Sequence, residues 1–350
     1  MQRSLFLATA VLLLDQLSKW AVLLQGTQPR HILEVTGFFN LVLTYNTGVS
    51  FGLFQGEAAW QPYVLVALNI VVAAGLLVRL FMIQHDCGHG AFFRHRRAND
   101  WVGRVLGVLT LTPYDAWRRA HATHHAGSGN LDRRGVGDIE TLTVGEYRAL
   151  GAWGRLRYRL YRNPLVMFGI GPVYLFVLRH RFPFGQGRDR RRAWVSAMAT
   201  NLAAATLIAT LIWLVGTGPF LLVQLPITLC AAAAGVWLFY VQHQFEETYW
   251  AGEEDWSLSE AALRGSSHYD LPGVLRWFTA NIGLHHIHHL NSRIPYYRLS
   301  RVLRDHPELK GASRLTLWQS LGCVRLALWD ETQRRLVSFR EARTTEKASL

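Results

Sequence analysis

Long apolar runs are the feature that most constrains what this chain can fold into. Four of them reach about 20 residues, the length that an α-helix needs to cross the hydrocarbon core of a bilayer. They cover residues 5–24, 63–84, 194–215 and 219–242. The turn-forming sequence GTGP at 216–219 joins the last two, so this pair is predicted to form a transmembrane hairpin. The predicted fold class is an all-α integral membrane protein with about four transmembrane helices.

Two further apolar runs are too short to span. Residues 105–114 form one of them, and residues 165–178 form the other. Arginines flank both ends of the second run, which conflicts with the positive-inside rule for a spanning helix. It is therefore interpreted as a re-entrant or interfacial helix.

The charge distribution predicts an orientation. The net charge of +13 would suggest nucleic-acid binding in a soluble protein. Here the basic residues flank apolar runs, so anionic lipid head groups explain them better, and no nucleic-acid partner is expected. The positive-inside rule places both termini in the cytoplasm, residues 25–62 and 216–218 outside, and residues 85–193 and 243–350 inside. The expected location is a bacterial inner membrane, and the β-rich pattern before the second run predicts a small external sheet.

The first apolar run is interpreted as a retained span. It lacks the small-residue cleavage site of a signal peptide, and Asp15 and Lys19 interrupt it. These two residues lie on one helical face, where they could pair inside the membrane or serve a function. The cysteines Cys87, Cys230 and Cys323 are far apart and predict neither a disulfide nor a zinc site, so Cys87 is interpreted as a small spacer.

Histidine is concentrated in four clusters next to the predicted spans or interfacial segments. The sequences HDCGH, HATHH and HHIHH place histidines three or four residues apart, and VQHQFEE adds one more. Residues at these spacings share a helical face, so each box is expected to direct its imidazoles toward a common point. One such cluster could be a solvated basic tract, whereas the ordered set predicts a metal centre. The candidate ligands are His85, His89, His121, His124, His125, His243, His285, His288 and His289.

Nine imidazoles are too many for one ion and suit two first-row metals, with oxygen chemistry favouring iron. Metal-bound histidines usually present their second nitrogen to a carboxylate or a carbonyl. The candidate carboxylates in or near the boxes are Asp86, Asp138, Glu246 and Glu247, and His268 and His286 could also touch the site. Ordinary surface positions are expected for the scattered histidines His31, His95, His180 and His306.

Long segments around these clusters resemble a known family. The segments are HDCGHGAFF, TPYDAWRRAHATHHAGSGNLDRRGVGDIETLT, VQHQFEETYW and SSHYDLPGVLRWFTANIGLHHIHHLNSRIPYYRL. They resemble the membrane fatty acid desaturases, above all the acyl-lipid Δ12 (omega-6) enzymes, over about residues 79–345. The resemblance implies a cytoplasmic helical cap with a non-haem di-iron centre held by the nine histidines. It also implies O₂ as co-substrate, electrons from ferredoxin or a cytochrome b5-type protein, and a membrane-lipid acyl chain as substrate.

The amino-terminal segment resembles a different family. DQLSK at 15–19 and NTGVSFGLF at 46–54 are similar to the early motifs of the type II lipoprotein signal peptidases. That family's catalytic aspartates come in later segments, where this chain has already changed to the desaturase pattern, so no peptidase activity is expected. The predicted organisation is a signal-peptidase-like segment at 1–78 with two spans, a desaturase domain at 79–345 and a tail at 346–350.

Several functions stay open at this point. A related di-iron hydroxylase or ketolase would use the same histidine boxes, and its product would distinguish it. An inactive chimera is a second alternative, because the replaced first spans could leave the acyl chain poorly enclosed. A lipoprotein peptidase would be sensitive to a peptidase inhibitor, and a non-catalytic metal-binding protein would consume no O₂. The sequence leaves the oligomeric state open.

Overall fold

A computed structural model describes most of the chain. The described residues are Leu14, Leu17, Ser18, Trp20, 32–36, 39–42, 60–183 and 190–348. The chain divides into two compact units, Met1–Leu68 and Asn69–Leu350. Asp15, Lys19 and His31 lie outside the described residues.

The first unit contains a small antiparallel sheet. Strands β1 (Ile32–Thr36) and β2 (Phe39–Val42) pair so that Ile32 faces Val42, and the register shifts between Glu34 and Thr36. This pairing confirms the small sheet predicted in the loop before the second apolar run.

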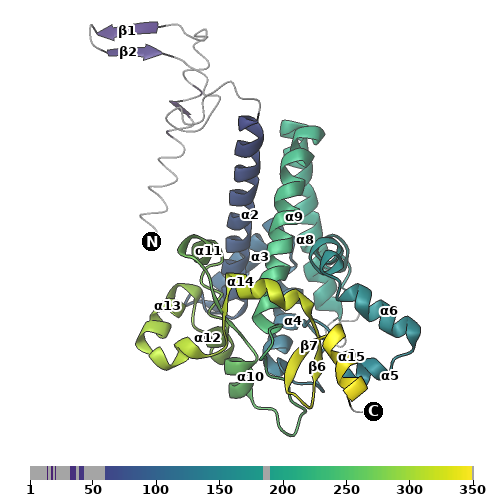
Figure 1. The fold of residues 1–350 in the computed structure, drawn as a ribbon. Coiled ribbons are helices and arrows are strands. Elements are labelled where there is room, and N and C mark those ends of the chain that lie inside the picture. The colour runs from purple at the N-terminus through teal and green to yellow at the C-terminus, as the bar shows by residue number, and fades with distance from the viewer. Residues whose placement is uncertain are drawn as a thin grey trace. The chain divides into compact units, whose positions relative to one another are not determined.

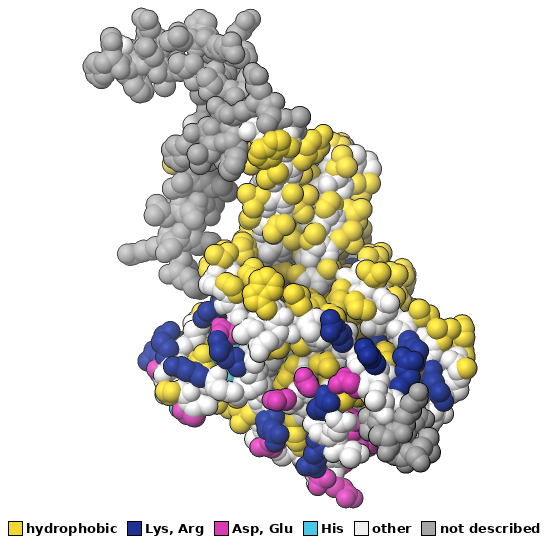
Figure 2. Space-filling view, in the orientation of Figure 1, with side chains coloured by type: hydrophobic (Ala, Val, Ile, Leu, Met, Phe, Trp, Pro, Cys, Tyr) yellow, Lys and Arg dark blue, Asp and Glu magenta, His cyan; other side chains and the backbone are white. Residues whose placement is uncertain are grey.

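Among the described residues, three helices are long and apolar enough to cross a membrane. They are α2 (Gln61–Gly88), α8 (Arg190–Val215) and α9 (Thr217–His243), and they correspond to the second, third and fourth predicted spans. The outer parts of these helices expose apolar side chains, a pattern that Figure 2 shows along the spans and that suits contact with lipid. The helical membrane-protein class is thereby confirmed. A fourth span at residues 5–24 remains a prediction, because that run is almost entirely outside the described residues.

Helices α8 and α9 form the predicted hairpin. Only Gly216 separates them, with φ +85°, a backbone conformation that glycine adopts at little cost. Figure 1 shows the two helices running side by side, and the first residues of α8 and the last residues of α9 lie at the same end of the pair. His243, the last residue of α9, therefore lies at the same end of the hairpin as the first residues of α8.

The remaining elements of the second unit form a helical cap around the same ends of the spans (Figure 1). Before the hairpin they are α3 (Arg96–Leu109), α4 (Tyr114–Gly127), β3 (Leu142–Thr143), α5 (Val144–Ala149), α6 (Ala152–Tyr161), the π-helical η2 (Val166–Ile170), α7 (Gly171–Val173) and the π-helical η3 (Tyr174–Arg179). After it come α10 (Leu258–Arg264), β4 (His268–Asp270), α11 (Gly273–Phe278), α12 (His285–Leu290), α13 (Tyr296–Asp305), η5 (Pro307–Gly311), β5 (Arg314–Thr316), α14 (Leu317–Ser320), η6 (Leu321–Arg325), β6 (Leu326–Asp330), β7 (Arg335–Ser338) and α15 (Phe339–Ala348).

Short sheets hold the carboxyl-terminal part of the cap against its middle. β6 pairs with β3 in parallel and with β7 antiparallel, and β4 pairs with β5 in parallel. α5 begins with a capping box, in which the Glu146 amide donates to Thr143 Oγ1 and the Thr143 amide donates to the Glu146 carboxylate. The pairing of β3 with β6 joins segments nearly 190 residues apart in the chain, as between Leu142 and Leu328.

A close contact between α3 and α4 orients the second histidine box. A Cβ on Gly103 would lie 2.2 Å from Tyr114, so only glycine allows the tyrosine ring to pack there. The Tyr114 hydroxyl then donates a 2.8 Å hydrogen bond to the carbonyl oxygen of Cys87 in α2. The start of α4 is thus tied to the end of α2, which carries the first box.

Neither of the two shorter apolar runs forms a helix long enough to span, as the sequence predicts. α3 ends at Leu109, and Leu111 with φ +53° separates it from α4. The run Val166–Arg179 forms an apolar helix that is shorter than the three spanning candidates. Its interfacial or re-entrant position remains a prediction.

Candidate metal centre

The nine candidate histidines come together in two groups. Within each group, one ring nitrogen from every member lies within 4.8 Å of those of the other members. The first histidine group consists of His85, His89, His121, His125 and His288. The second histidine group consists of His124, His243, His285 and His289.

Helix geometry explains how the boxes are divided between the groups. Residues four apart stay together, as His121 with His125 and His285 with His289. The residue at the i+3 position points into the other group, because it lies about 100° around the helix from the i+4 residue. The expectation that each box serves one common point holds for the first box, whose His85 and His89 are both in the first group. It is wrong for the second and third boxes, because α4 and α12 each contribute to both groups.

The distances between ring nitrogens are short. In the first group the Nε2 atoms of His85 and His121 are 2.9 Å apart, and those of His125 and His288 are 3.1 Å apart. In the second group the Nε2 atoms of His243 and His285 are 3.0 Å apart. Two nitrogens held at right angles about 2.1 Å from one ion would lie about 3 Å apart. The donor sets therefore fit first-row metal ions.

Two unpaired nitrogens support the same fit. His89 Nε2 and His124 Nε2 are buried and have no hydrogen-bond partner among the described residues. A buried ring nitrogen without a partner costs free energy. An ion within each group would provide the missing partner.

Burial favours the neutral, metal-binding form of six of these imidazoles. It holds the pKa of His89, His121 and His125 well below the usual value, and neighbouring imidazoles lower it further. The pKa values of the third box are lowered for the same reasons, at His285, His288 and His289. Neutral histidine offers a lone pair without first losing a proton.

Acceptors next to the histidines fix the second ring nitrogen. His124 Nδ1 donates to the carboxylate of Asp138, and His243 Nδ1 donates a 3.1 Å hydrogen bond to the carbonyl oxygen of Gly265. His85 Nδ1 lies 3.4 Å from the Asp86 carboxylate, whose other oxygen accepts a 2.7 Å hydrogen bond from the Tyr296 amide. Such acceptors set the tautomer and the orientation of a metal-binding imidazole.

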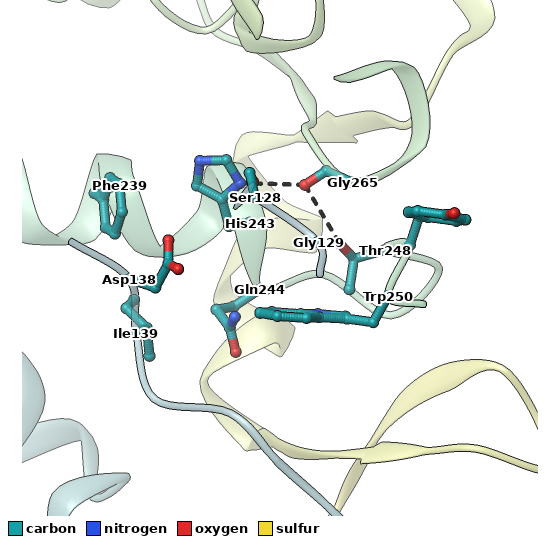
Figure 3. Close-up of a pocket in the computed structure, with 11 residues that line it drawn as sticks. Ser128, Gly129, Asp138, Ile139, Phe239, His243, Gln244, Thr248, Trp250 and Gly265 are labelled. Carbon is teal, nitrogen blue, oxygen red and sulfur yellow. Dashed lines mark hydrogen bonds between the residues drawn. The ribbon is translucent and has the colours of Figure 1, made fainter. Parts of the chain in front are cut away.

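A small pocket borders the second histidine group. Figure 3 shows Asp138 and His243 on one side of it and Trp250 on the other, with Gln244 between them. The carbonyl oxygen of Gly265 also accepts a 3.4 Å hydrogen bond from Thr248 Oγ1, so two donors hold it in place. Polar groups thus approach the second group from this side.

The two remaining candidate carboxylates lie elsewhere. Glu246 is exposed and forms an ion pair with Arg335 at 2.7 Å. Glu247 is also exposed. The partner of His243 is a backbone carbonyl, which has no signature in a sequence.

The other described histidines and Cys87 fall outside both groups. His286 is fully buried and donates to the carbonyl oxygen of Leu309 at 3.0 Å, with the His268 ring 5.4 Å away. Exposed positions, as expected, are found for His95 and His306. His180 departs from that expectation: it is half-buried, and burial lowers its pKa to about 4.

Trp117 is a neighbour of the site that the sequence did not reveal. Its ring stacks on His121 with a centroid distance of 4.7 Å and an interplanar angle of 16°. Because Trp117 lies four residues before His121, the helical face of the box already contained this signal.

Fold and site define a helical membrane protein with two histidine groups that could each hold a metal ion. The profile described as fatty acid desaturase matches residues 58–320. A fatty acid desaturase of Bacillus subtilis (strain 168) is 48% identical over 79% of this chain and 78% of its own length. The chain therefore belongs to the fatty acid desaturase family, whose members are oxidoreductases.

More distant relatives have more specific names. An sn-1 acyl-lipid omega-3 desaturase (ferredoxin) of Synechocystis sp. is 28% identical, over 77% of this chain and 74% of its own length. An sn-1 oleoyl-lipid 12-desaturase of the same organism is 29% identical, over 69% of this chain and 68% of its own length. The profile of signal peptidase II matches residues 7–94, so residues 58–94 are shared between the two profiles.

Proposed function

We propose that this protein introduces a double bond into the acyl chain of a membrane lipid, with O₂ as oxidant and two iron ions held by the nine histidines. The observation that carries the proposal is the convergence of nine imidazoles, buried or half-buried, into two groups beside the ends of the spans. Family membership supplies the reaction class.

The ligand assignment follows the two groups. Five histidines would hold one ion and four the other, which leaves open positions for oxygen chemistry. Iron bound there would supply, with O₂, an oxidant strong enough to remove hydrogen from an unactivated CH₂ group. Three acceptors keep histidines in the orientation that metal binding requires. Asp138 orients His124, Asp86 orients His85, and the carbonyl oxygen of Gly265 orients His243.

The overall reaction sets what the chain must provide. An acyl CH₂–CH₂ pair, O₂, two electrons and two protons give one CH=CH bond and two water molecules. Aromatic rings line part of the site: Phe239 lies 5.1 Å from His124, and Trp117 covers His121. Such walls exclude bulk water, which would otherwise compete with the acyl chain for the oxidant.

Position 12 is the proposed site of the double bond. The sequence resembles the Δ12 (omega-6) enzymes, and an oleoyl-lipid 12-desaturase is among the relatives. Omega-3 desaturases are also relatives at similar identity, so fatty acid analysis has to decide. Conversion of monoenoic to dienoic chains with the new bond at carbon 12 is the expected result.

The proposed location is the bacterial inner membrane, with both termini and the histidine groups in the cytoplasm. The arginines around the cap support this orientation. A reporter fused after Leu350 should report cytoplasm, and one inserted near Gly56 should report the outside. A result that places HATHH and HHIHH on opposite faces would contradict the site.

The amino-terminal segment is proposed to be a replacement for the first spans of a desaturase. Residues 1–78 would form the signal-peptidase-like segment, and residues 79–345 the desaturase domain, followed by a short tail. Because the first candidate ligand is His85, iron binding should not need residues 1–60. Enclosure of the acyl chain could need the first spans, which residues 1–78 replace here. We therefore expect weak desaturation by the given chain. Desaturation should improve in a hybrid in which the first spans of an ordinary desaturase are joined to this chain near Arg79. Equal activity of the given chain and this hybrid would show that the replaced spans suffice.

Expression in a host that lacks polyunsaturated lipids tests the main proposal. We expect dienoic acyl chains in the host lipids, and none with a His124→Ala control. A hydroxylated or oxidised product would favour the related hydroxylase or ketolase. Unchanged lipids together with two bound irons would favour an inactive chimera, and failure to bind iron would overturn the proposal.

A further inference from the structure

Two arginine-rich segments lie next to each other on the cap. One precedes and begins α3, and the other surrounds α13. Together they form what we term the basic face: Arg94, Arg96, Arg97, Arg293, Arg298, Arg301 and Arg304, all exposed. Contacts of Phe92 with Tyr296 and Tyr297, at ring distances of 6.1 and 6.0 Å, bring the two segments together.

Few carboxylates balance this charge. Asp305 pairs with Arg301 at 3.3 Å, Asp100 pairs with Arg118, and Glu308 contacts His306. Within the described part of the chain, no carboxylate lies within ion-pairing distance of the other six arginines. The basic face therefore presents a net positive charge to its surroundings, and Figure 2 shows a group of basic side chains over the region of α13.

Aromatic residues connect this face to the first histidine group. Tyr297 is 53% exposed, and its ring lies 5.6 Å from that of Tyr296. The Tyr296 amide donates to Asp86, and the other Asp86 oxygen lies against His85. A short series of contacts thus runs from the surface to the site.

Arg79 and Phe92 fix Tyr296 in this position. The Arg79 guanidinium lies 5.3 Å from the Tyr296 ring and donates to its hydroxyl at 3.4 Å, whereas Phe92 stacks on the ring. The surface and the first histidine group are consequently joined by packed side chains rather than by a mobile loop.

We propose that the basic face is the docking surface for a small acidic electron-transfer protein. The proposal rests on the proposed function, because the reaction needs two electrons that the acyl chain and O₂ do not supply. A one-electron carrier would dock twice for each double bond, and each time its reduced centre would lose one electron to the site. Opposite charges would steer the encounter and orient the carrier over Tyr297.

An anionic lipid surface is the competing occupant. Figure 1 places α11 between α13 and the outer part of α2, so α13 is farther than α11 from the apolar spans. The exposed apolar residues Val274 and Trp277 belong to α11 and are better suited to meet lipid. The basic face is therefore assigned to the soluble partner.

The test uses charge reversal in the full-length, iron-loaded protein in nanodiscs. The variant is Arg298→Glu with Arg304→Glu, and the matched control is Arg157→Glu with Arg340→Glu, two exposed arginines elsewhere on the cap. The probe is an acidic [2Fe–2S] ferredoxin. Its binding is measured at several salt concentrations, and desaturation is measured with reduced ferredoxin and, in parallel, with dithionite in single turnover.

We expect the α13 variant to bind ferredoxin at least tenfold more weakly, with a shallower salt dependence. Its ferredoxin-driven rate should fall similarly, whereas its dithionite-driven turnover and iron content stay unchanged. The control should resemble the parent in every assay. Equal loss in both variants, or loss of binding to anionic vesicles without loss of ferredoxin binding, would overturn the proposal. Absence of desaturation in the parent with both reductants would count against the proposed function, while the binding comparison would still test the face.

Discussion

The two histidine groups differ in how completely they are enclosed. All four members of the second group are buried, whereas three of the five members of the first group are only half-buried. The second group is oriented by Asp138 and by the Gly265 carbonyl oxygen. The first group is bordered by Trp117 and by the contacts that lead to the exposed Tyr297.

This difference suggests a division of labour. A fully buried group with fixed acceptors holds its metal rigidly, because every rotation of an imidazole would break a hydrogen bond or a packing contact. A group nearer the surface is better placed to receive electrons. Because α4 and α12 contribute to both groups, a shift of either helix should disturb the two together.

Loss of a single histidine from either group should have the largest effect on iron content and turnover. His124→Ala and His288→Ala should each reduce bound iron from two ions to about one and lower turnover at least about 1,000-fold, because both metals are needed for the chemistry. Membrane insertion should stay intact. Iron analysis and fatty acid profiles measure both effects. Retained activity in both variants would show that the ligand assignment is wrong.

Removal of the negative charge beside His124 should weaken mainly the second group. Asp138→Asn keeps the shape but removes the charge, so the affinity for one of the two irons should fall about 10- to 100-fold. Competition with a chelator measures the two affinities separately. Glu246→Gln serves as the control, since that carboxylate pairs with Arg335. Similar losses in the two variants would contradict the role of Asp138.

A change just before the third box should disturb both groups equally. A Cβ on Gly283 would lie 2.3 Å from the carbonyl oxygen of Tyr269 in β4. Gly283→Ala should therefore cost roughly 1–3 kcal/mol in the free energy of unfolding. The same change at Gly322 meets no atom within 4 Å and should have little effect. Thermal unfolding of both variants measures the difference, and a selective loss of one iron would show that α12 does not couple the groups.

The smallest effect is expected from the aromatic neighbour of the first group. Trp117→Ala removes a stacked ring worth roughly 0.5–1.5 kcal/mol, which corresponds to about a two- to tenfold loss of affinity at the first group. The second group should keep its affinity. Trp101, 66% exposed on α3, provides the control substitution. An equal effect on both groups would contradict the separation between them.

Spacing and hydropathy predicted much of this arrangement. The runs 63–84, 194–215 and 219–242 coincide with α2, α8 and α9, because an apolar helix of that length has few alternatives to a membrane. The four clusters named all nine histidines that the structure brings together. The carboxylate beside His124 was also among the candidates, since Asp138 lies near the second box.

Other features could not be read from the sequence. The acceptor of His243 is the carbonyl oxygen of Gly265, and every residue has such a group, so no residue type marks it. Glu246 is close to His243 in the chain, yet its carboxylate turns outward to Arg335. The contact between Phe92 and Tyr296 joins residues about 200 apart, which periodicity cannot reveal.

The sequence by itself determined which segments are long and apolar enough to span the membrane and which side chains could bind metal, because both properties depend on residue type and local spacing. Only the tertiary structure decided how the histidines are divided into five and four. That division depends on the directions in which α2, α4, α9 and α12 meet. Residues three and four apart on a helix point about 100° from each other, so the neighbouring helices decide which group each imidazole joins.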